Sequence, residues 1–310
     1  MTNLEKVRQL RGIVIKALDQ LIDRDYWLLE VPYYSNVGDT LIWQGELDCL
    51  SRLPYMCKGI YSFNSRRQAD IPDGDLILLQ GGGNLGDIYR EPNDYRKKII
   101  SEHPNSRVII LPQTVCWQEE ANYCADAEFF SRYDCTICVR DHKSSEWLSR
   151  KFTNKLLLLP DMAFCIDSKR FKCTRCTKRP LLLKRLDVEL KDGPLLKERE
   201  SSGRYDVTDW IPITAPTGWR LWERRIRRLI SFSPRIYDWY MQCIVRRYHF
   251  ASGVALISGR REVCTTRLHA CILSILMGVE RIEVIDNSYG KNSSFYETWL
   301  SDCENVKMIS

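Results

Sequence analysis

The chain has 310 residues, of which 44% are hydrophobic and 28% are charged, and its formal net charge is +6. This length suits two domains of about 100–200 residues each, and the composition is ordinary for a soluble globular protein. No apolar run approaches the roughly 18 residues that a membrane span needs, which argues against an integral membrane protein.

The N-terminal segment and the cysteines bear on the location of the protein. Residues 1–25 carry apolar side chains at helical spacing, interrupted by acids, which predicts an amphipathic helix and not a secretion signal. Thirteen cysteines are scattered through apolar segments, a distribution typical of reduced thiols. We therefore expect a cytoplasmic protein.

Two Cys-x-x-Cys pairs raise the question of a metal. Cys135 and Cys138 lie in a predicted strand, where residues three apart point to opposite faces. Cys173 and Cys176 lie in a basic connector and could bind zinc, but their distance from the first pair is longer than in common zinc ribbons. We predict no metal site, with this second pair as the open alternative.

The first half of the chain alternates strands and helices. Continuous apolar runs such as residues 76–79 are typical of central parallel strands, so the pattern predicts an α/β domain. Asp39 or Thr40 is expected to cap its first internal helix. Strands are expected at residues 26–31, 75–80, 107–114, 133–141 and 156–163, with helices at about 41–50 and 144–150.

Polar and charged side chains follow these strands. The segment 81–87, Gly-Gly-Gly-Asn-Leu-Gly-Asp, is expected to be a glycine-rich loop, and it is not a P-loop because no Gly-Lys-Ser/Thr follows. The carboxyl ends of parallel strands meet at one edge of a sheet, where open α/β sheets bind ligands. The residues that predict a shared cleft there are Asn36, Asp39, Gly82, Gly83, Asn84, Asp87, Arg140 and Asp161.

A polar, basic connector at residues 167–179 predicts a domain boundary. We expect an N-terminal domain at residues 1–170, on the acceptor side, and a C-terminal domain at residues 180–310 that holds the donor. A strand at 180–187 opens the second domain, with Arg185 and Asp187 at its end. The charged segment 188–217, rich in turn-forming residues, is expected to be a mobile loop.

The net charge is concentrated in residues 218–250, which hold eight arginines against Glu223 and Asp238. Tryptophans and aliphatic residues recur there near one helical face, which is typical of a helix that lies in a membrane interface. The alternative is a core-packed helix with a solvated arginine face. Nucleic acid is not expected as a partner, because no nucleic-acid module is recognisable and the rest of the chain is neutral.

A strand-to-helix turn near the C-terminus carries Arg267 and His269. We expect a strand at 261–264, a Thr265-Thr266 cap and a buried helix at 270–278. The start of a helix favours an anion, and an arginine there matches a phosphate or a carboxylate. A histidine adds a proton donor near neutral pH. A surface arginine with a core histidine is the alternative reading.

A further strand at 281–286 leads to Lys291 after a glycine turn at the same edge. The last helix, at 295–300, is expected to pack back on the N-terminal domain.

In their order along the chain, these motifs resemble the polysaccharide pyruvyl transferase family. The resemblance covers residues 26–300 and is weakest at 188–250. It rests on Asn36-Val37-Gly38-Asp39, Gly81 to Asp87, Val139-Arg140-Asp141, Pro160-Asp161-Met162-Ala163, Thr266-Arg267-Leu268-His269, Asp286-Asn287 and Tyr289-Gly290-Lys291.

The resemblance implies an α/β fold with two Rossmann-like domains facing a cleft, similar to GT-B glycosyltransferases. It implies phosphoenolpyruvate as the donor, a pyruvate ketal on a sugar as the product, and neither a metal nor a nicotinamide cofactor. Within the family, the positions matching Arg140, Arg267 and His269 are associated with the donor.

The residues fit this chemistry. Phosphoenolpyruvate carries a phosphate and a carboxylate, which Arg140 and Arg267 could bind from opposite domains. His269 is the candidate acid for its methylene carbon, and Lys291 could hold the leaving phosphate. Asp161 or Asp39 is expected to accept the sugar proton or to orient the acceptor. The triglycine segment is expected to face the acceptor or to shape the cleft.

The main alternative function is a GT-B glycosyltransferase with a nucleotide sugar, which would use the same fold and a basic cleft. A non-catalytic scaffold at the membrane is disfavoured, because Arg140, Arg267, His269 and Lys291 are all present. If the acceptor is a sugar on a polyprenyl diphosphate, residues 218–250 would hold the enzyme peripherally on the anionic cytoplasmic face of the membrane.

Overall fold

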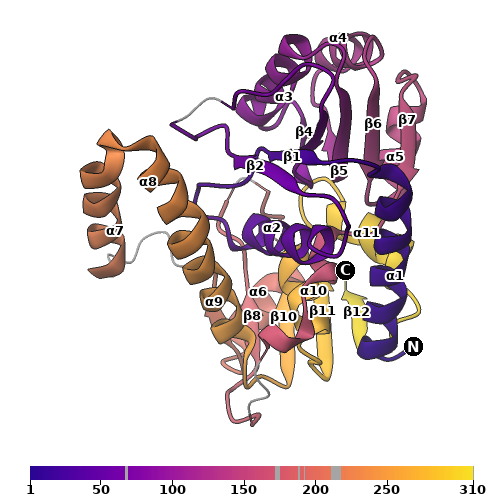
Figure 1. Cartoon of the computed structure of the whole chain (residues 1–310). Coiled ribbons are helices and arrows are strands. Elements are labelled where there is room, and N and C mark those ends of the chain that lie inside the picture. Colours follow the sequence, from indigo (N-terminus) through magenta and orange to yellow (C-terminus); the bar gives the residue numbers. More distant parts are fainter. Residues whose placement is uncertain (67–68, 172–174, 188, 192, 211–217, 310) are drawn as a thin grey trace.

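Two parallel β-sheets make up the fold, one in each half of the chain (Figure 1). The computed structural model describes residues 1–310 except 67–68, 172–174, 188, 192, 211–217 and 310, and it does not describe the side chains of residues 218–221 and 224. Helices α2 and α10 lie between the sheets and contact each other. The predicted fold class, two Rossmann-like α/β units, is confirmed.

The first sheet has seven strands in the order β2-β1-β3-β5-β6-β7, with β4 paired to β5. Every residue of β3 is buried, as its unbroken leucine and isoleucine sequence predicts. The strands are β1 Tyr26–Leu29, β2 Cys57–Tyr61, β3 Leu76–Leu79, β4 Gly82–Gly86, β5 Arg107–Cys116, β6 Cys135–Val139 and β7 Lys155–Leu158. The helices of this part are α2 Val37–Leu50, α3 Arg90–Glu102, α4 Glu120–Phe130 and α5 His142–Ser149, followed by short 3₁₀ turns at Met162–Cys165 and Ser168–Arg170.

The second sheet has five strands in the order β12-β11-β10-β8-β9. Its strands are β8 Leu181–Leu183, β9 Asp206–Thr208, β10 Glu262–Thr265, β11 Arg281–Ile285 and β12 Val306–Ile309. Its helices are α6 Pro194–Ser201, α10 Leu268–Leu276 and α11 Lys291–Trp299.

In each sheet, the chain changes once the side on which it adds the next strand. The chain steps from β1 outward to β2 and then crosses to β3, and it steps from β8 to β9 and then crosses to β10. Ligands of open α/β sheets bind outside the carboxyl ends of the strands at such a reversal. The two reversal points therefore mark where a site should lie in each half.

The helices at the two ends of the chain cross between the halves. In α1 (Asn3–Leu21), Leu10 packs into the core of the second sheet, whereas Val14 and Leu18 pack into the core of the first. From α11, Trp299 Nε1 donates to the carbonyl of Arg140 at 2.8 Å. Contacts from both ends of the chain thus join the two halves.

A helical hairpin, residues 218–257, projects at the side of the molecule (Figure 1). It consists of α7 Gly218–Leu229, a 3₁₀ turn at Ile230–Phe232, and a long second arm in which α8 Pro234–Tyr240, a π-helical segment Met241–Val245 and α9 Arg246–Ile257 follow without a break. Pro234 begins the second arm, as its fixed φ angle favours. Within the part of the chain that the structure describes, no helix has both the length and the apolar character needed to cross a membrane.

The expectation of a mobile loop at residues 188–217 is wrong for the described residues. They include α6 and the edge strand β9, and Leu196 and Tyr205 are buried against Leu182 and Cys264. Two isolated apolar residues in a charged segment give no periodic signal, so only the packing reveals these elements.

The segment predicted as a triglycine loop is largely strand β4. Gly86 has φ +134°, and a Cβ there would lie 1.9 Å from the Cys116 carbonyl oxygen. The glycine therefore permits a close approach of two backbones, which sequence alone does not distinguish from a turn.

Three helix boundaries also differ from the prediction. Asn36, and not Asp39 or Thr40, caps α2. Arg267 occupies the N-cap position of α10, while the Thr265 hydroxyl accepts from its backbone N–H at 2.9 Å. The last helix begins at Lys291, four residues before the predicted start.

Candidate active site

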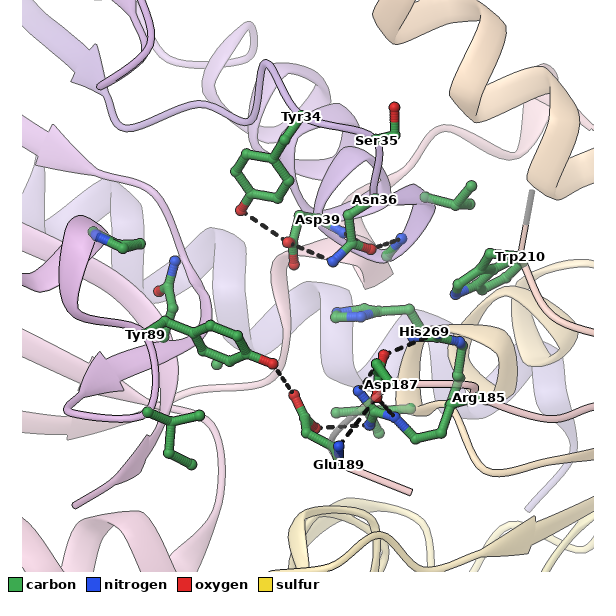
Figure 2. Close-up of a pocket in the computed structure, with 18 of the residues that line it drawn as sticks. Tyr34, Ser35, Asn36, Asp39, Tyr89, Arg185, Asp187, Glu189, Trp210 and His269 are labelled. Atoms are coloured by element: carbon green, nitrogen blue, oxygen red, sulfur yellow. Dashed lines mark hydrogen bonds and ion pairs between the residues drawn. The ribbon is translucent and has the colours of Figure 1, made fainter. Parts of the chain in front are cut away.

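A cleft of about 840 Å³ lies between the halves, at both reversal points (Figure 2). The start of α2 and the glycine strand β4 line it from the first half. The residues after β8, the turn between β10 and α10, and the start of α11 line it from the second half. In Figure 2, Asn36 and Asp39 face the group around Arg185, with His269 between them.

The wall at α2 presents one oriented carboxylate. The Asn36 side-chain oxygen accepts from the backbone N–H of Gly38 at 2.9 Å and thereby caps the helix. The Asn36 amide and the Tyr34 hydroxyl donate to the same oxygen of Asp39, at 2.7 and 2.9 Å. These bonds fix the Asp39 carboxylate at the edge of the cleft.

Arg140, Asp161 and His269 form a buried row behind the cleft. Arg140 Nη1 donates to Asp161 Oδ2 at 2.5 Å, and its Nε donates to the Thr114 hydroxyl at 2.9 Å. The same Asp161 oxygen lies 3.2 Å from His269 Nε2. Burial alone would raise the pKa of Asp161, but the positive charges of His269 and Arg140 outweigh burial and hold that pKa well below its usual range.

This row decides which nitrogen of His269 serves the cleft. A carboxylate that stays ionised accepts a hydrogen bond from Nε2–H and stabilises an imidazolium. The other nitrogen, Nδ1, faces α2, where a Cβ on Gly38 would lie only 2.7 Å from it. His269 also lines the cleft. The geometry therefore leaves Nδ1 as the ring nitrogen that Asp161 does not engage.

Two cationic groups converge on Gly83 in strand β4. A Cβ there would lie 2.6 Å from Lys291 Nζ and 3.1 Å from Arg140 Nη2. Arg140 Nη2 is buried and has no hydrogen-bond partner. Buried polar atoms are almost always paired, so an unpaired guanidinium nitrogen calls for a ligand.

Lys291 is a largely buried lysine without a close carboxylate partner. Its Nζ lies 3.9 Å from Glu189 Oε2, too far for a hydrogen bond. Burial lowers the pKa of Lys291, Glu189 opposes this shift, and Arg140 adds to it. An anion bound between Lys291 and Arg140 would offset both the cost of burying the lysine charge and the repulsion between the two cations.

Arg267 and Arg185 belong to an ionic network on the opposite wall. Arg267 donates from Nε and Nη2 to the two oxygens of Asp209, at 2.5 and 2.6 Å. Arg185 donates from Nη1 to Glu189 at 2.7 Å, and both of these arginines also pair with Asp187. The bonds of Arg267 to Asp209 use one edge of its fork, which leaves Nη1 on the other edge.

Of the site residues predicted from sequence, some line the cleft and others do not. Arg140 and Asp161 are fully buried behind the cleft. They influence it only through residues that line it, namely His269 and Gly83. Gly82 does not line the cleft, since it pairs with β5. The predicted residues that line the cleft are Asn36, Asp39, Gly83, Asn84, Arg267, His269 and Lys291.

Asp87 does not line the cleft, contrary to the prediction. Its carboxylate accepts from the backbone N–H groups of Gln118 and Glu119, at 2.7 and 3.0 Å, directly before α4. The residue therefore anchors the start of a helix, which is a common role for an aspartate in such a loop.

Sequence reasoning missed a second buried ion pair. Glu30 accepts from Arg96 Nη2 and Nε at 2.6 and 2.7 Å, and Arg96 Nη2 also donates to Asn84 Oδ1 at 2.6 Å. Glu30 has φ +70°, a conformation that non-glycine residues rarely adopt. An acid at the end of the strand at 26–31 was the available signal for this support of β4.

Glu189, Tyr89 and Asp209 were missed as well. Tyr89 donates to Glu189 at 2.9 Å across the cleft, as Figure 2 shows. Burial alone would raise the pKa of Glu189, but Lys291 and Arg185 outweigh burial and lower the pKa to about 2. Glu189 and Asp209 fall in the segment expected to be a mobile loop, and Tyr89 carries no sequence signal.

A metal site would need a cluster of His, Cys, Asp or Glu side chains. Within the described ranges, no group of three or more His, Cys, Asp or Glu residues is placed to hold a metal ion. Cys135 and Cys138 are buried free thiols in β6. Cys173 lies outside the described residues, so the absence of a metal site stays a prediction, with zinc at Cys173 and Cys176 as its alternative.

Comparison with known proteins gives the same family as the motifs. The profile of the family described as polysaccharide pyruvyl transferase matches residues 36–289. EpsO of Bacillus subtilis strain 168, named as a candidate pyruvyl transferase, is 30% identical over 97% of this chain and 92% of its own. Pyruvyl transferase 1 of Schizosaccharomyces pombe is 28% identical over 89% of this chain and 70% of its own.

The fold has a solved counterpart. The crystal structure of a functionally uncharacterized protein from Klebsiella pneumoniae matches over 100% of both chains, with a TM-score of 0.63 and 19% identity. The profile, the curated relatives and the ordered motifs agree. The chain therefore belongs to the polysaccharide pyruvyl transferase family, and the protein is an enzyme of that family.

Proposed function

We propose that the protein transfers the pyruvyl group of phosphoenolpyruvate to two hydroxyls of one sugar and releases phosphate. The observation that carries this proposal is the convergence at Gly83. An unpaired, buried guanidinium nitrogen of Arg140 and the ammonium of Lys291 meet there, beside the cleft that His269 lines. A small dianion next to a proton donor matches that arrangement.

The donor would lie between the two walls. Its phosphate fits at Arg140 Nη2, which has no hydrogen-bond partner, and at Lys291, whose Nζ lies 3.9 Å from the nearest oxygen of Glu189. Its carboxylate fits Nη1 of Arg267, a cation of the opposite wall. His269 Nδ1 then faces the methylene carbon. The bonds from Asp209 and Asp161 hold Arg267 and His269 in position before the donor arrives.

The reaction runs by proton transfer and two additions. His269 gives a proton to the methylene carbon of phosphoenolpyruvate, which leaves a positive centre at C2. A sugar hydroxyl attacks C2 and loses its proton. The C2–O bond to phosphate then breaks, the phosphate leaves with its electron pair, and a second hydroxyl closes the ketal and loses its proton. One of the two protons restores His269, and the other leaves on the phosphate.

Asp39 is the carboxylate best placed to serve the acceptor. It lines the cleft with its orientation fixed by Asn36 and Tyr34, whereas Asp161 is buried and engaged with Arg140. The acceptor would be a sugar of a polysaccharide or of a lipid-linked glycan precursor, and no cofactor is needed beyond the co-substrate. We place the reaction in the cytoplasm, because every described cysteine is a free thiol.

A thermal-shift titration tests the donor. Phosphoenolpyruvate at about 100 times its dissociation constant should stabilise the fold by about 2.7 kcal/mol, and sugar nucleotides should not. Gly83→Ala should abolish the shift, because the new Cβ occupies the space between Lys291 and Arg140. Gly12→Ala is the matched control, since nothing lies within 4 Å of a Cβ there.

Either of two results would argue against the proposal. Stabilisation by a sugar nucleotide alone would favour a glycosyltransferase with the same fold. If phosphoenolpyruvate shifted the melting temperature of Gly83→Ala as much as that of the wild type, the donor would not bind at this position.

A further inference from the structure

The outer surface of the helical hairpin has an unusual composition. Among the described side chains of residues 222–247, every exposed one is either arginine or large and apolar. The apolar ones are Trp222, Leu229, Phe232, Ile236, Trp239 and Ile244. The basic ones are Arg225, Arg228, Arg235 and Arg247.

The most exposed apolar side chains lie at the turn of the hairpin. Phe232 in the turn is 81% exposed, and Leu229 at the end of α7 is 69% exposed. Trp222 and Trp239, on the two arms, are 63% and 57% exposed. Single exposed apolar residues are normal, but several on one short hairpin, accompanied by charges of one sign, indicate an interaction surface.

The hairpin does not need these side chains to hold its place. On its other face, Tyr237, Tyr240, Met241 and Val245 pack into the core of the first sheet. Arg246 donates to Gln44 of α2 and lies 5.3 Å over the Trp43 ring. The alternative expectation, a core-packed helix with a solvated arginine face, therefore accounts for this packing and for the exposed arginines, but not for the exposed large apolar side chains.

The acids of the hairpin are withdrawn from its outer surface. Glu223 pairs with Arg227 within α7, and Asp238 is buried. Arg227 also donates to the carbonyl of Tyr33 at 3.2 Å, so it too belongs to the inner face. No exposed acid among the described side chains of residues 222–247 offsets the four outer arginines.

We propose that the outer surface of the hairpin docks on an anionic lipid bilayer. Phe232, Leu229 and the two exposed tryptophans would enter the boundary between headgroups and acyl chains, and the arginines would contact lipid phosphates. A soluble acidic protein would account for the arginines, but it gives no reason for a bulky aromatic at the turn that is 81% exposed.

Docking on lipid would also bring the cleft close to the membrane surface. Glu223 of α7 lines the cleft, while its neighbour Trp222 is exposed on the outer surface. A single helix therefore separates the site from the membrane. This step rests on the proposed function: the sugar acceptor would carry a lipid anchor and would reach the cleft along α7.

Vesicle flotation with the full chain tests the surface. The protein should float with vesicles of equimolar phosphatidylglycerol and phosphatidylcholine and stay in solution with phosphatidylcholine alone. The triple variant Arg225→Glu/Arg228→Glu/Arg235→Glu should bind on the order of 100-fold more weakly, since each basic residue near an anionic surface is worth about fivefold.

The control variant carries the same charge change elsewhere. Arg8, Arg132 and Arg150 are exposed on α1, after α4 and after α5, and their replacement by glutamate lowers the formal net charge by the same amount. This variant should float like wild type. Equal loss in both triple variants would mean that only net charge matters and would overturn the proposal.

A second variant tests the apolar contact. Leu229→Ser/Phe232→Ser leaves the charge unchanged and should also reduce flotation. Tryptophan emission of the wild type should shift to the blue with anionic vesicles. A wild type that stays in solution with both vesicles, or that forms a dimer through the hairpin instead, would overturn the proposal.

Donor binding separates this inference from the proposed function. Both hairpin variants lie outside the donor site, so phosphoenolpyruvate should stabilise them as it does the wild type. If the protein bound the donor but did not float, only the proposal of a membrane-binding surface would be rejected. Flotation without donor binding would discard the pyruvyl chemistry and leave the surface in place.

Discussion

Replacement of His269 by glutamine is expected to lower kcat by about 10²–10⁴-fold, the usual contribution of an acid–base group. Glutamine keeps the polar shape of the side chain but cannot deliver a proton to the methylene carbon. The affinity for phosphoenolpyruvate should change little, because Arg140 and Lys291 hold the phosphate. The measurement is phosphate release in the steady state, with the dissociation constant of the donor determined in parallel.

His142→Gln is the matched control, because His142 is exposed on α5 and its side chain lies away from the cleft. It should retain the activity of the wild type. A His269→Gln enzyme that turns over as fast as this control would remove His269 from the chemistry and would leave proton transfer to another residue of the cleft.

Asp161→Asn should be the most destabilising single change at the site. It leaves the guanidinium of Arg140 buried without its charged partner at 2.5 Å, and breaking such a buried pair costs about 3–5 kcal/mol. Urea unfolding of both proteins measures this difference. The change should also lower kcat, because His269 Nε2 would no longer face a carboxylate.

A double variant separates the structural effect from the catalytic one. Arg140→Met/Asp161→Leu replaces the pair with apolar side chains of similar volume and should recover most of the lost stability. Its kcat should stay low, because donor contact and imidazole orientation are both gone. Full stability in Asp161→Asn alone would contradict the account of a buried, charge-balanced row.

The same aspartate predicts a dependence on pH. Its pKa is lowered in the folded protein, so the unfolded chain binds its proton first as the pH falls. The stabilisation is complete above the unfolded pKa of about 3.9 and is lost progressively below it. Asp161→Asn should therefore unfold with a weaker dependence on pH in the acid range than the wild type does.

The strands of both sheets could be predicted from the sequence, because buried parallel strands appear as continuous apolar runs. Leu76–Leu79 and Leu181–Leu183 are short, unbroken apolar runs, and each is buried in the structure between two neighbouring strands of its sheet. The polar residues after such strands had to meet at one edge of each sheet. That His269 of the second half and Asp39 of the first share one cleft was predicted from the family resemblance, which implies two domains facing a cleft.

The remaining contacts depend on how the two halves dock. Gly83, Arg140 and Lys291 are far apart in the sequence and belong to three different elements, so no local pattern shows that two cations converge on the glycine. The pairing of Arg267 with Asp209 was hidden for the same reason. Asp209 lies in a stretch whose order comes from burial of a few side chains and not from periodicity.

The most direct test of the donor site is calorimetric titration of phosphoenolpyruvate into wild type and Lys291→Met. Lys98→Met, an exposed lysine of α3, is the control. A hydrogen bond to a charged group is worth about 1.5–3 kcal/mol, so the loss of Lys291 should weaken binding by about 10–150-fold while the control binds like wild type. Equal affinity in all three proteins, or no binding to the wild type, would contradict the assignment of this site to phosphoenolpyruvate.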